Sequence, residues 1–152
     1  MVFLKVSERL FRGPQPGYND LVRLQKKGLK AVFNLRDESV ESRAISLDLG
    51  LNYHHLRVRD WHHPTHGQVD EFFELLFSPG WAPALVHCWG GVGRTGIFVS
   101  CYRIRHHGWD CEQALTRSDE ETPHLIMSEL QREWIRGWTE RGCDRPESDF
   151  TR

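Results

Sequence analysis

Short runs of apolar residues alternate along the chain with segments whose apolar residues recur every three or four positions. Residues 29–35 (LKAVFNL), 51–58 (LNYHHLRV) and 84–88 (ALVHC) are short and rich in strand-forming side chains. This pattern predicts three buried strands. The start of the chain, MVFLKVSERLFRG, has a shorter apolar run followed by charges, which is typical of a first strand or an edge segment.

Helical periodicity dominates the remaining segments. The predicted helices cover residues 20–28, 38–50, 68–77, 95–108, 111–118 and 124–142. The fourth of them is apolar around most of its circumference, so it should be central and buried. In the last one, Leu130, Trp134 and Trp138 are spaced four apart and should form its apolar face.

The alternation of strands and helices predicts a single α/β domain with a mostly parallel central sheet flanked by helices. A chain of 152 residues fits one domain with a core of its own. We expect the domain at residues 1–142 and a polar C-terminal tail at residues 143–152. Ligands of such sheets bind at the carboxyl ends of the strands, and Cys88 stands at one of these ends.

The charge balance argues against some classes of partner. The formal net charge is -1, with 39% hydrophobic and 27% charged residues, which is typical of a globular chain in water. No apolar stretch reaches the ~20 residues that cross a membrane, and the first residues lack the pattern of a signal peptide. We therefore expect a cytoplasmic protein, a monomer, with no nucleic-acid or membrane partner.

Cysteine and histidine positions do not favour a metal site. The cysteines are Cys88, Cys101, Cys111 and Cys143. None of them is in C-x-x-C spacing, and a chain with its own core does not need disulfides, so reduced thiols are expected. Three histidines gather in one loop: His62, His63 and His66. They lack a fourth ligand at useful spacing, so we expect solvated side chains near a substrate, and neither a metal nor a cofactor.

The segment 88–94, CWGGVGR, has the composition of an anion-binding turn between a strand and a helix. Its glycines allow a tight turn whose amide N–H groups point inward, and the following helix adds the positive end of its dipole. The phosphate-binding positions are Trp89, Gly90, Gly91, Val92, Gly93 and Arg94. A tetrahedral oxyanion fits this turn, and Arg94 can bind two of its oxygens.

The same field favours the thiolate of Cys88, which would lie under a bound phosphate as a nucleophile. Thr95 is placed to donate a hydrogen bond to the sulfur, and His87 to orient the loop through backbone contacts. A nucleotide-binding P-loop would need Lys followed by Ser or Thr after its last glycine, and Arg94 stands there instead. The alternative for Cys88, a small buried residue at a strand end, is disfavoured by these spacings.

The stretch HCWGGVGRTG resembles the H-C-x-x-G-x-x-R-[ST]-G signature of cysteine-dependent protein tyrosine phosphatases, particularly the small atypical dual-specificity phosphatases. LFRGPQP and VFNLRDE are similar to the N-terminal segments of small stand-alone microbial members. The resemblance covers residues 8–140. It implies catalysis by Cys88 and Arg94 without a cofactor, and a chain order in which a general acid precedes the cysteine.

LRVRDWHHPT resembles the acid loop of this family and puts Asp60 in the position of the general acid. A solvated loop aspartate is the alternative, and Asp70 is a weaker rival because it falls within a predicted helix. Many atypical members have a Glu-Thr-x-x-Gln segment after the cysteine loop. Gln131 lies further along here, so it is either a water-positioning residue or an exposed helix residue.

The resemblance implies a phosphomonoesterase acting on phosphotyrosine, with phosphoserine and phosphothreonine as further substrates. Trp89 and Val92 are apolar where inositol-phosphate-directed relatives often have basic residues. Trp61 and Trp89 either line the pocket or belong to the core or rim. Four arginines either attract an anionic substrate or are solvated or structural: Arg12, Arg36, Arg57 and Arg59. The alternatives for function are an inositol-phosphate, nucleotide or RNA 5′-phosphate phosphatase, and a phosphate-binding module without turnover.

Overall fold

A five-stranded sheet forms the centre of the computed structural model, which describes residues 2–141. The strands are β1 (Leu4–Ser7), β2 (Leu10–Gly13), β3 (Ala31–Arg36), β4 (Asn52–Val58) and β5 (Ala84–His87), in the order β1-β2-β5-β3-β4. All neighbours pair in parallel except β1, which runs antiparallel to β2. The sequence prediction of a mostly parallel sheet is therefore confirmed.

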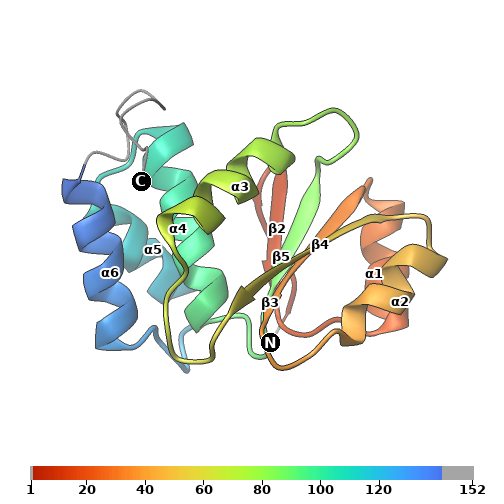
Figure 1. Ribbon diagram of the computed structural model, residues 1–152, viewed down its shortest axis with the longest axis horizontal. Coiled ribbons are helices and arrows are strands. Elements are labelled where there is room, and N and C mark those ends of the chain that lie inside the picture. The colour runs from red at the N-terminus through yellow and green to blue at the C-terminus, as the bar shows by residue number, and fades with distance from the viewer. Residues whose placement is uncertain (1, 142–152) are drawn as a thin grey trace.

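Six helices cover the two faces of the sheet. They are α1 (Tyr18–Lys26), α2 (Glu41–Asp48), α3 (His66–Leu76), α4 (Gly93–His107), α5 (Cys111–Glu121) and α6 (Glu129–Glu140). Helices α1 and α2 lie on one face, and α3 to α6 lie on the other (Figure 1). No helix in the described part of the chain is both long and apolar enough to span a membrane.

Helix α4 is the central helix that the sequence predicts. Every residue from Arg94 to Ile104 is buried. Phe98 packs edge-on against Phe72 of α3, with ring centroids 5.2 Å apart, and Phe72 meets Phe33 of β3 at 4.8 Å. Because this aromatic stack joins sheet, α3 and α4, it fixes the direction in which α4 leaves the end of β5.

Three details of the sequence prediction were incomplete or wrong. The start of the chain forms two strands, because β1 turns back on β2 after Ser7. The last helix begins at Glu129 instead of residue 124, where Ser128 caps it. Leu130 is 49% exposed, and the buried side of α6 consists of Gln131, Ile135 and Trp138. The predicted tail, residues 143–152, lies outside the described residues.

Candidate active site

The turn between β5 and α4, residues 88–92, is anchored to the end of β2. The backbone N–H of Gln15 donates to the Trp89 carbonyl oxygen at 3.0 Å. Gly91 has a φ of 77°, and a Cβ built there would lie 2.7 Å from the Gly13 carbonyl carbon. Only glycine satisfies both conditions, so the glycine at position 91 is required by the closeness of β2 as well as by the turn.

Cys88 is buried at the base of this turn. The Gly91 N–H donates to its Sγ at 3.3 Å. The Thr95 hydroxyl is also buried, but it makes no hydrogen bond to any described residue. The predicted bond from Thr95 to the sulfur is therefore absent from this arrangement of the loop.

Arg94, in the first turn of α4, is held by groups from two other strand ends. Its Nη1 donates to Glu38 Oε1 at 2.8 Å and to the Val58 carbonyl oxygen at 3.0 Å, and its Nη2 donates to Glu38 Oε2 at 3.2 Å. Asp60 Oδ1 lies 3.2 Å from Nη2. Glu38 thus takes the end-on edge of the guanidinium, and Asp60 lies at the Nη2 end of the Nε–Nη2 edge, which has the shape to bind two oxygens of one anion.

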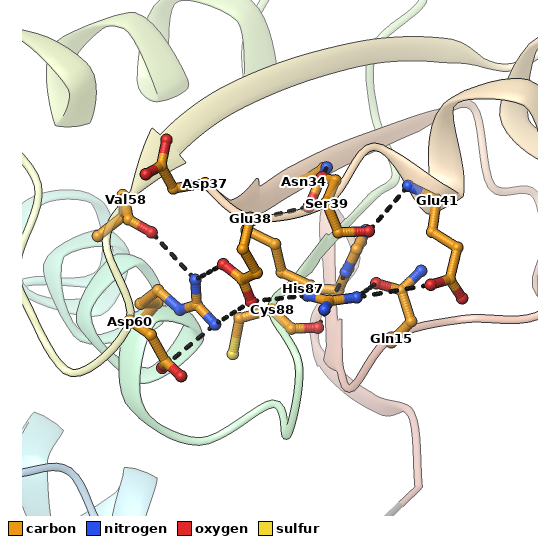
Figure 2. Close-up of polar contacts among 12 residues, drawn as sticks. Gln15, Asn34, Asp37, Glu38, Ser39, Glu41, Val58, Asp60, His87 and Cys88 are labelled. Carbon is orange, nitrogen blue, oxygen red and sulfur yellow. Dashed lines mark hydrogen bonds and ion pairs between the residues drawn. The ribbon is translucent and has the colours of Figure 1, made fainter.

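The positions of Glu38 and Asp60 follow from the two strands that end beside β5. Glu38 follows β3, in a turn that Asn34 closes by accepting from the Arg36 N–H and donating to the Ser39 carbonyl oxygen. Asp60 follows β4, on the far side of β3. Both carboxyl groups point toward the side of the turn on which Cys88 lies (Figure 2).

The ion pairs at this edge shift the titration of both partners. The hydrogen bond from Arg94 lowers the pKa of Glu38 to about 2, with a further bond from Arg36. Burial opposes the charged form of Arg94, but the Glu38 hydrogen bond and the negative charges of Cys88 and Asp60 outweigh it and raise its pKa. Arg94 is therefore a permanent cation beside the sulfur.

His87, the last residue of β5, is buried and neutral. Its Nδ1 lies 3.1 Å from the Cys88 carbonyl oxygen, which only accepts, so Nδ1 carries the proton. Its Nε2 accepts from the Ser42 hydroxyl of α2 at 2.8 Å. Burial lowers the pKa of His87 to about 4. The imidazole thus joins the backbone at Cys88 to the helix on the other face of the sheet.

A second arginine supports the turn from behind. Arg12 of β2 is buried and donates to the Gly91 carbonyl oxygen at 3.0 Å, to Ser118 Oγ at 3.0 Å and to Glu121 Oε1 at 2.9 Å. Arg103 of α4 donates to both oxygens of Glu121, at 2.9 and 2.7 Å. Burial lowers the pKa of Arg12, and Glu121 opposes that shift.

This geometry agrees with the comparison to known protein families. A family model described as "DSP-PTPase phosphatase fused to NAD+ kinase" matches residues 4–136. The chain belongs to the dual-specificity phosphatases, within the cysteine-dependent protein tyrosine phosphatase superfamily.

Two relatives match different shares of this chain. Human dual specificity protein phosphatase CDC14C is 37% identical over 84 residues, which is 55% of this chain and 19% of CDC14C. TpbA of Pseudomonas aeruginosa is 30% identical over 123 residues, which is 79% of this chain and 52% of TpbA. The chain thus spans only about half of TpbA, and much less of CDC14C.

Two solved structures show the same fold. A cysteine-to-serine variant of P. aeruginosa TpbA in complex with pTyr superposes with a TM-score of 0.68 at 20% identity, covering 92% of this chain and 91% of that one. The catalytic core of the PP-IP phosphatase SIW14 from S. cerevisiae, in complex with citrate, gives 0.76 at 18% identity and covers 93% of both chains.

The phosphatase fold brings the residues singled out by sequence to one edge of the sheet, with one exception. Cys88, Arg94 and Asp60 converge there. Asp70 instead pairs with Arg105 at 3.5 Å, ~16 Å further along α4 than Arg94. Gln131 is buried, so its alternative as an exposed helix residue is wrong.

Gln131 joins three parts of the site. Its Oε1 accepts from the Ser128 N–H at 3.0 Å in the cap of α6, and its Nε2 donates to the His62 carbonyl oxygen at 3.0 Å in the acid loop. A Cβ at Gly93 would lie 2.9 Å from both of these side-chain atoms. Gln131 therefore packs on Gly93, at the start of α4, and ties the loop of Asp60 to α6.

The remaining aromatic and basic residues divide between rim and scaffold. Trp61 and Trp89 are exposed, and the Arg36 guanidinium lies 5.0 Å from the Trp89 ring centroid. Arg57 and Arg59 are exposed as well, whereas Arg12 has the structural role described above. Trp89 is thus a rim residue held by Arg36.

The histidine loop packs against α6. His63 stacks on Trp134 with ring centroids 5.3 Å apart, and His66 contacts the same ring. Among the described residues, no three His, Cys, Asp or Glu side chains gather as metal ligands. Cys88, Cys101 and Cys111 form no disulfide with one another, and Cys143 lies outside the described residues.

Sequence reasoning missed Glu38, Ser42 and the role of Arg12. Glu38 is a charged residue in a turn, which by composition is indistinguishable from a solvated one. One signal was present: Glu38 follows the carboxyl end of a predicted parallel strand, as Cys88 and Asp60 do.

Proposed function

We propose that the chain is a phosphomonoesterase that hydrolyses phosphotyrosine, with phosphoserine and phosphothreonine as further substrates. The observation that carries this proposal is the convergence of Arg94 and Asp60, 3.2 Å apart, at the turn that holds Cys88. The pTyr complex of TpbA, a relative with the same fold, supports the choice of substrate.

The first step transfers the phosphoryl group to sulfur. The Cys88 thiolate attacks phosphorus, the bond between phosphorus and the leaving oxygen breaks, and the Asp60 carboxyl group gives its proton to that oxygen. The amides of residues 89–94 and the Nε–Nη2 edge of Arg94 stabilise the three equatorial oxygens. Asp60 now faces Arg94, so the arriving phosphate replaces Asp60 on Nη2 and leaves its carboxyl group beside the leaving oxygen.

The second step hydrolyses the phosphocysteine. Water attacks phosphorus, Asp60 takes a proton from it, the bond between phosphorus and sulfur breaks, and inorganic phosphate leaves with Cys88 again a thiolate. Gln131 lies between the turn and the acid loop, which favours its role in positioning this water. Neither step requires a metal for its balance, because Cys88, Asp60 and water account for each proton and electron pair.

The test is the hydrolysis of an aryl phosphate and of a phosphotyrosine peptide, each with and without a chelator. Wild type should turn over both substrates at a rate that the chelator does not change. Cys88→Ser should show no turnover, and Asp60→Asn should lose about 100-fold in kcat. Full activity of Cys88→Ser would contradict the mechanism, and phosphate binding without turnover by wild type would favour the binding module.

The substrate alternatives are compared in the same assay. SIW14 is named as a PP-IP phosphatase, so an inositol polyphosphate is the sharpest competitor. Trp89 and Val92 give the turn no basic side chain for a second phosphate. A kcat/KM for inositol polyphosphates above that for every phosphopeptide would replace phosphotyrosine as the substrate class.

A further inference from the structure

An apolar hollow of about 430 Å³ adjoins the phosphate-binding turn. Gly90 and Val92 of the turn form one wall, and the α5–α6 connection (residues 122–128) forms the other through Thr122, Pro123 and Leu125. Val2 closes one end. Its volume lies within the range of about 300–1,000 Å³ that is usual for ligand pockets.

Little of the surface that lines the hollow is polar. Among the described residues that line it, none is a lysine or an arginine. Glu121 reaches it, but both carboxylate oxygens of Glu121 are bound by Arg12 and Arg103. The lining offers a second phosphate no lysine or arginine, and its one basic side chain is the imidazole of His124, whereas an apolar group would lose only water.

The α5–α6 connection is fixed in shape although it carries exposed apolar side chains. The Thr122 hydroxyl lies 2.9 Å from the Leu125 carbonyl oxygen, and Met127 is buried against Gly96 of α4. Leu125 is nevertheless 64% exposed. Apolar side chains held in water beside a catalytic turn indicate a binding surface, and its rigidity lowers the entropic cost of binding.

We propose that this hollow binds an apolar side chain next to the phosphotyrosine of a peptide substrate. Gly90 and Val92 belong to both the hollow and the phosphate-binding turn, so a chain whose phosphate lies in the turn can reach the hollow with an adjacent residue. The inference rests on the proposed function. It favours, as substrates, phosphopeptides with an apolar residue next to the phosphotyrosine, and it disfavours polyphosphorylated small molecules.

The experiment compares kcat/KM for matched phosphotyrosine peptides that carry Leu, Ser or Asp on either side of the phosphoresidue. Wild type should prefer a Leu peptide about ten-fold over its Ser and Asp counterparts, because the hollow buries that side chain. Leu125→Ser should reduce the preference to about two-fold. Leu47→Ser, at a similarly exposed leucine of α2 outside the hollow, should keep it.

An aryl phosphate, which has no flanking residue, separates the possible failures. Leu125→Ser should hydrolyse it at the wild-type rate. Equal kcat/KM for all peptides, or a Leu preference unchanged in Leu125→Ser, would overturn the hollow as a subsite while aryl phosphate turnover kept the phosphatase function. An inositol polyphosphate preferred over every peptide would also overturn it. Absence of aryl phosphate turnover would instead overturn the proposed function.

Discussion

The two sides of the phosphate-binding turn are each built on an arginine, but the carboxylates that hold these arginines differ in exposure. On the substrate side, Arg94 is held by Glu38 and Asp60, whose side chains are 42% and 57% exposed. Behind the turn, Arg12 is held by Glu121, which is 15% exposed and shared with Arg103. One arrangement faces water, and the other belongs to the core.

This difference in exposure explains how the turn can exchange a partner on its substrate side while its rear stays in place. The Asp60 carboxyl group is exposed and can return to water at little cost, so it can leave the buried Arg94 when phosphate arrives. A buried pair is costly to break, so Arg12 keeps the Gly91 carbonyl in place. Two arginines share a single carboxylate behind the turn, which leaves positive charge near Cys88 from that side as well as from Arg94.

Arg94→Lys tests the substrate side with the largest expected effect. Lysine keeps the charge but lacks the fork that binds Glu38 and two phosphate oxygens together. We expect kcat to fall about 1,000-fold, and the free energy of unfolding in urea to fall by about 1–3 kcal/mol because the Val58 carbonyl oxygen loses its buried donor. A kcat within ten-fold of wild type would mean that charge alone suffices.

Arg12→Met tests the rear of the turn, with Arg103→Met as its matched control. Each change removes one arginine from Glu121 and should lower the free energy of unfolding by about 3 kcal/mol. Only Arg12 also donates to Gly91. Arg12→Met should therefore lose about ten-fold in kcat, because a buried carbonyl without a donor costs about 1–3 kcal/mol and the turn moves to relieve it. Equal kcat losses in both variants would show that Glu121, and not the Gly91 contact, matters.

The sequence predicted most of the residues that meet on the substrate side of the turn. It predicted few of the contacts behind the turn. Apolar runs gave β3, β4 and β5, and the rule that sites gather at the carboxyl ends of parallel strands brought Cys88, Arg94 and Asp60 together. Arg12 could not be placed, because a buried arginine and a solvated one have the same local sequence. Its burial depends on Glu121, a residue 109 positions away.

The start of α6 shows the same limit. Leu130, Trp134 and Trp138 have helical spacing, yet tertiary contacts turn α6 so that Gln131 faces inward, onto Gly93 and the acid loop. Residues 122–128 have a composition that a helix accepts, but they form a connection that Thr122 and Met127 anchor. Helical periodicity reports local preference only. It therefore did not predict that Gln131, a polar residue, is buried beside the site.

His87 links the buried side of the turn to α2. Its titration makes the stability of the folded protein depend on pH. The pKa of His87 is about 4 in the folded protein and ~6.5 when unfolded. The unfolded chain therefore binds the proton first, and stability is lost as pH falls from about 6.5 to about 4, by roughly 3 kcal/mol in total. Urea unfolding at several pH values should show this slope in wild type.

His87→Asn should remove that part of the slope, and His124→Asn, at an exposed histidine, should retain it. His106, whose pKa burial also lowers to about 4, keeps its own contribution in all three proteins. The difference between wild type and His87→Asn thus isolates the contribution of the buried His87, whose pKa burial lowers. Parallel slopes would mean that His87 has the same pKa in the folded and the unfolded protein.

Glu38→Gln is the finest test of the comparison, because it weakens the exposed holder of Arg94 without removing the arginine. The amide keeps one hydrogen-bond acceptor, loses the charge, and turns an N–H toward a donor. We expect kcat to fall about five-fold, in line with a contribution of up to ~1 kcal/mol from an exposed pair. KM should not rise, because a negative charge near the phosphate site is lost.

Glu41→Gln is the control for Glu38→Gln, since Glu41 carries the same charge and lies 3.9 Å from Arg36 but does not contact Arg94. It should leave kcat unchanged. If Glu38→Gln instead lowered kcat as much as Arg94→Lys, the exposed Glu38 carboxylate would be as important for the turn as the buried Glu121 carboxylate. The substrate side would then be a fixed scaffold like the rear, and Asp60 alone would have to move when phosphate binds.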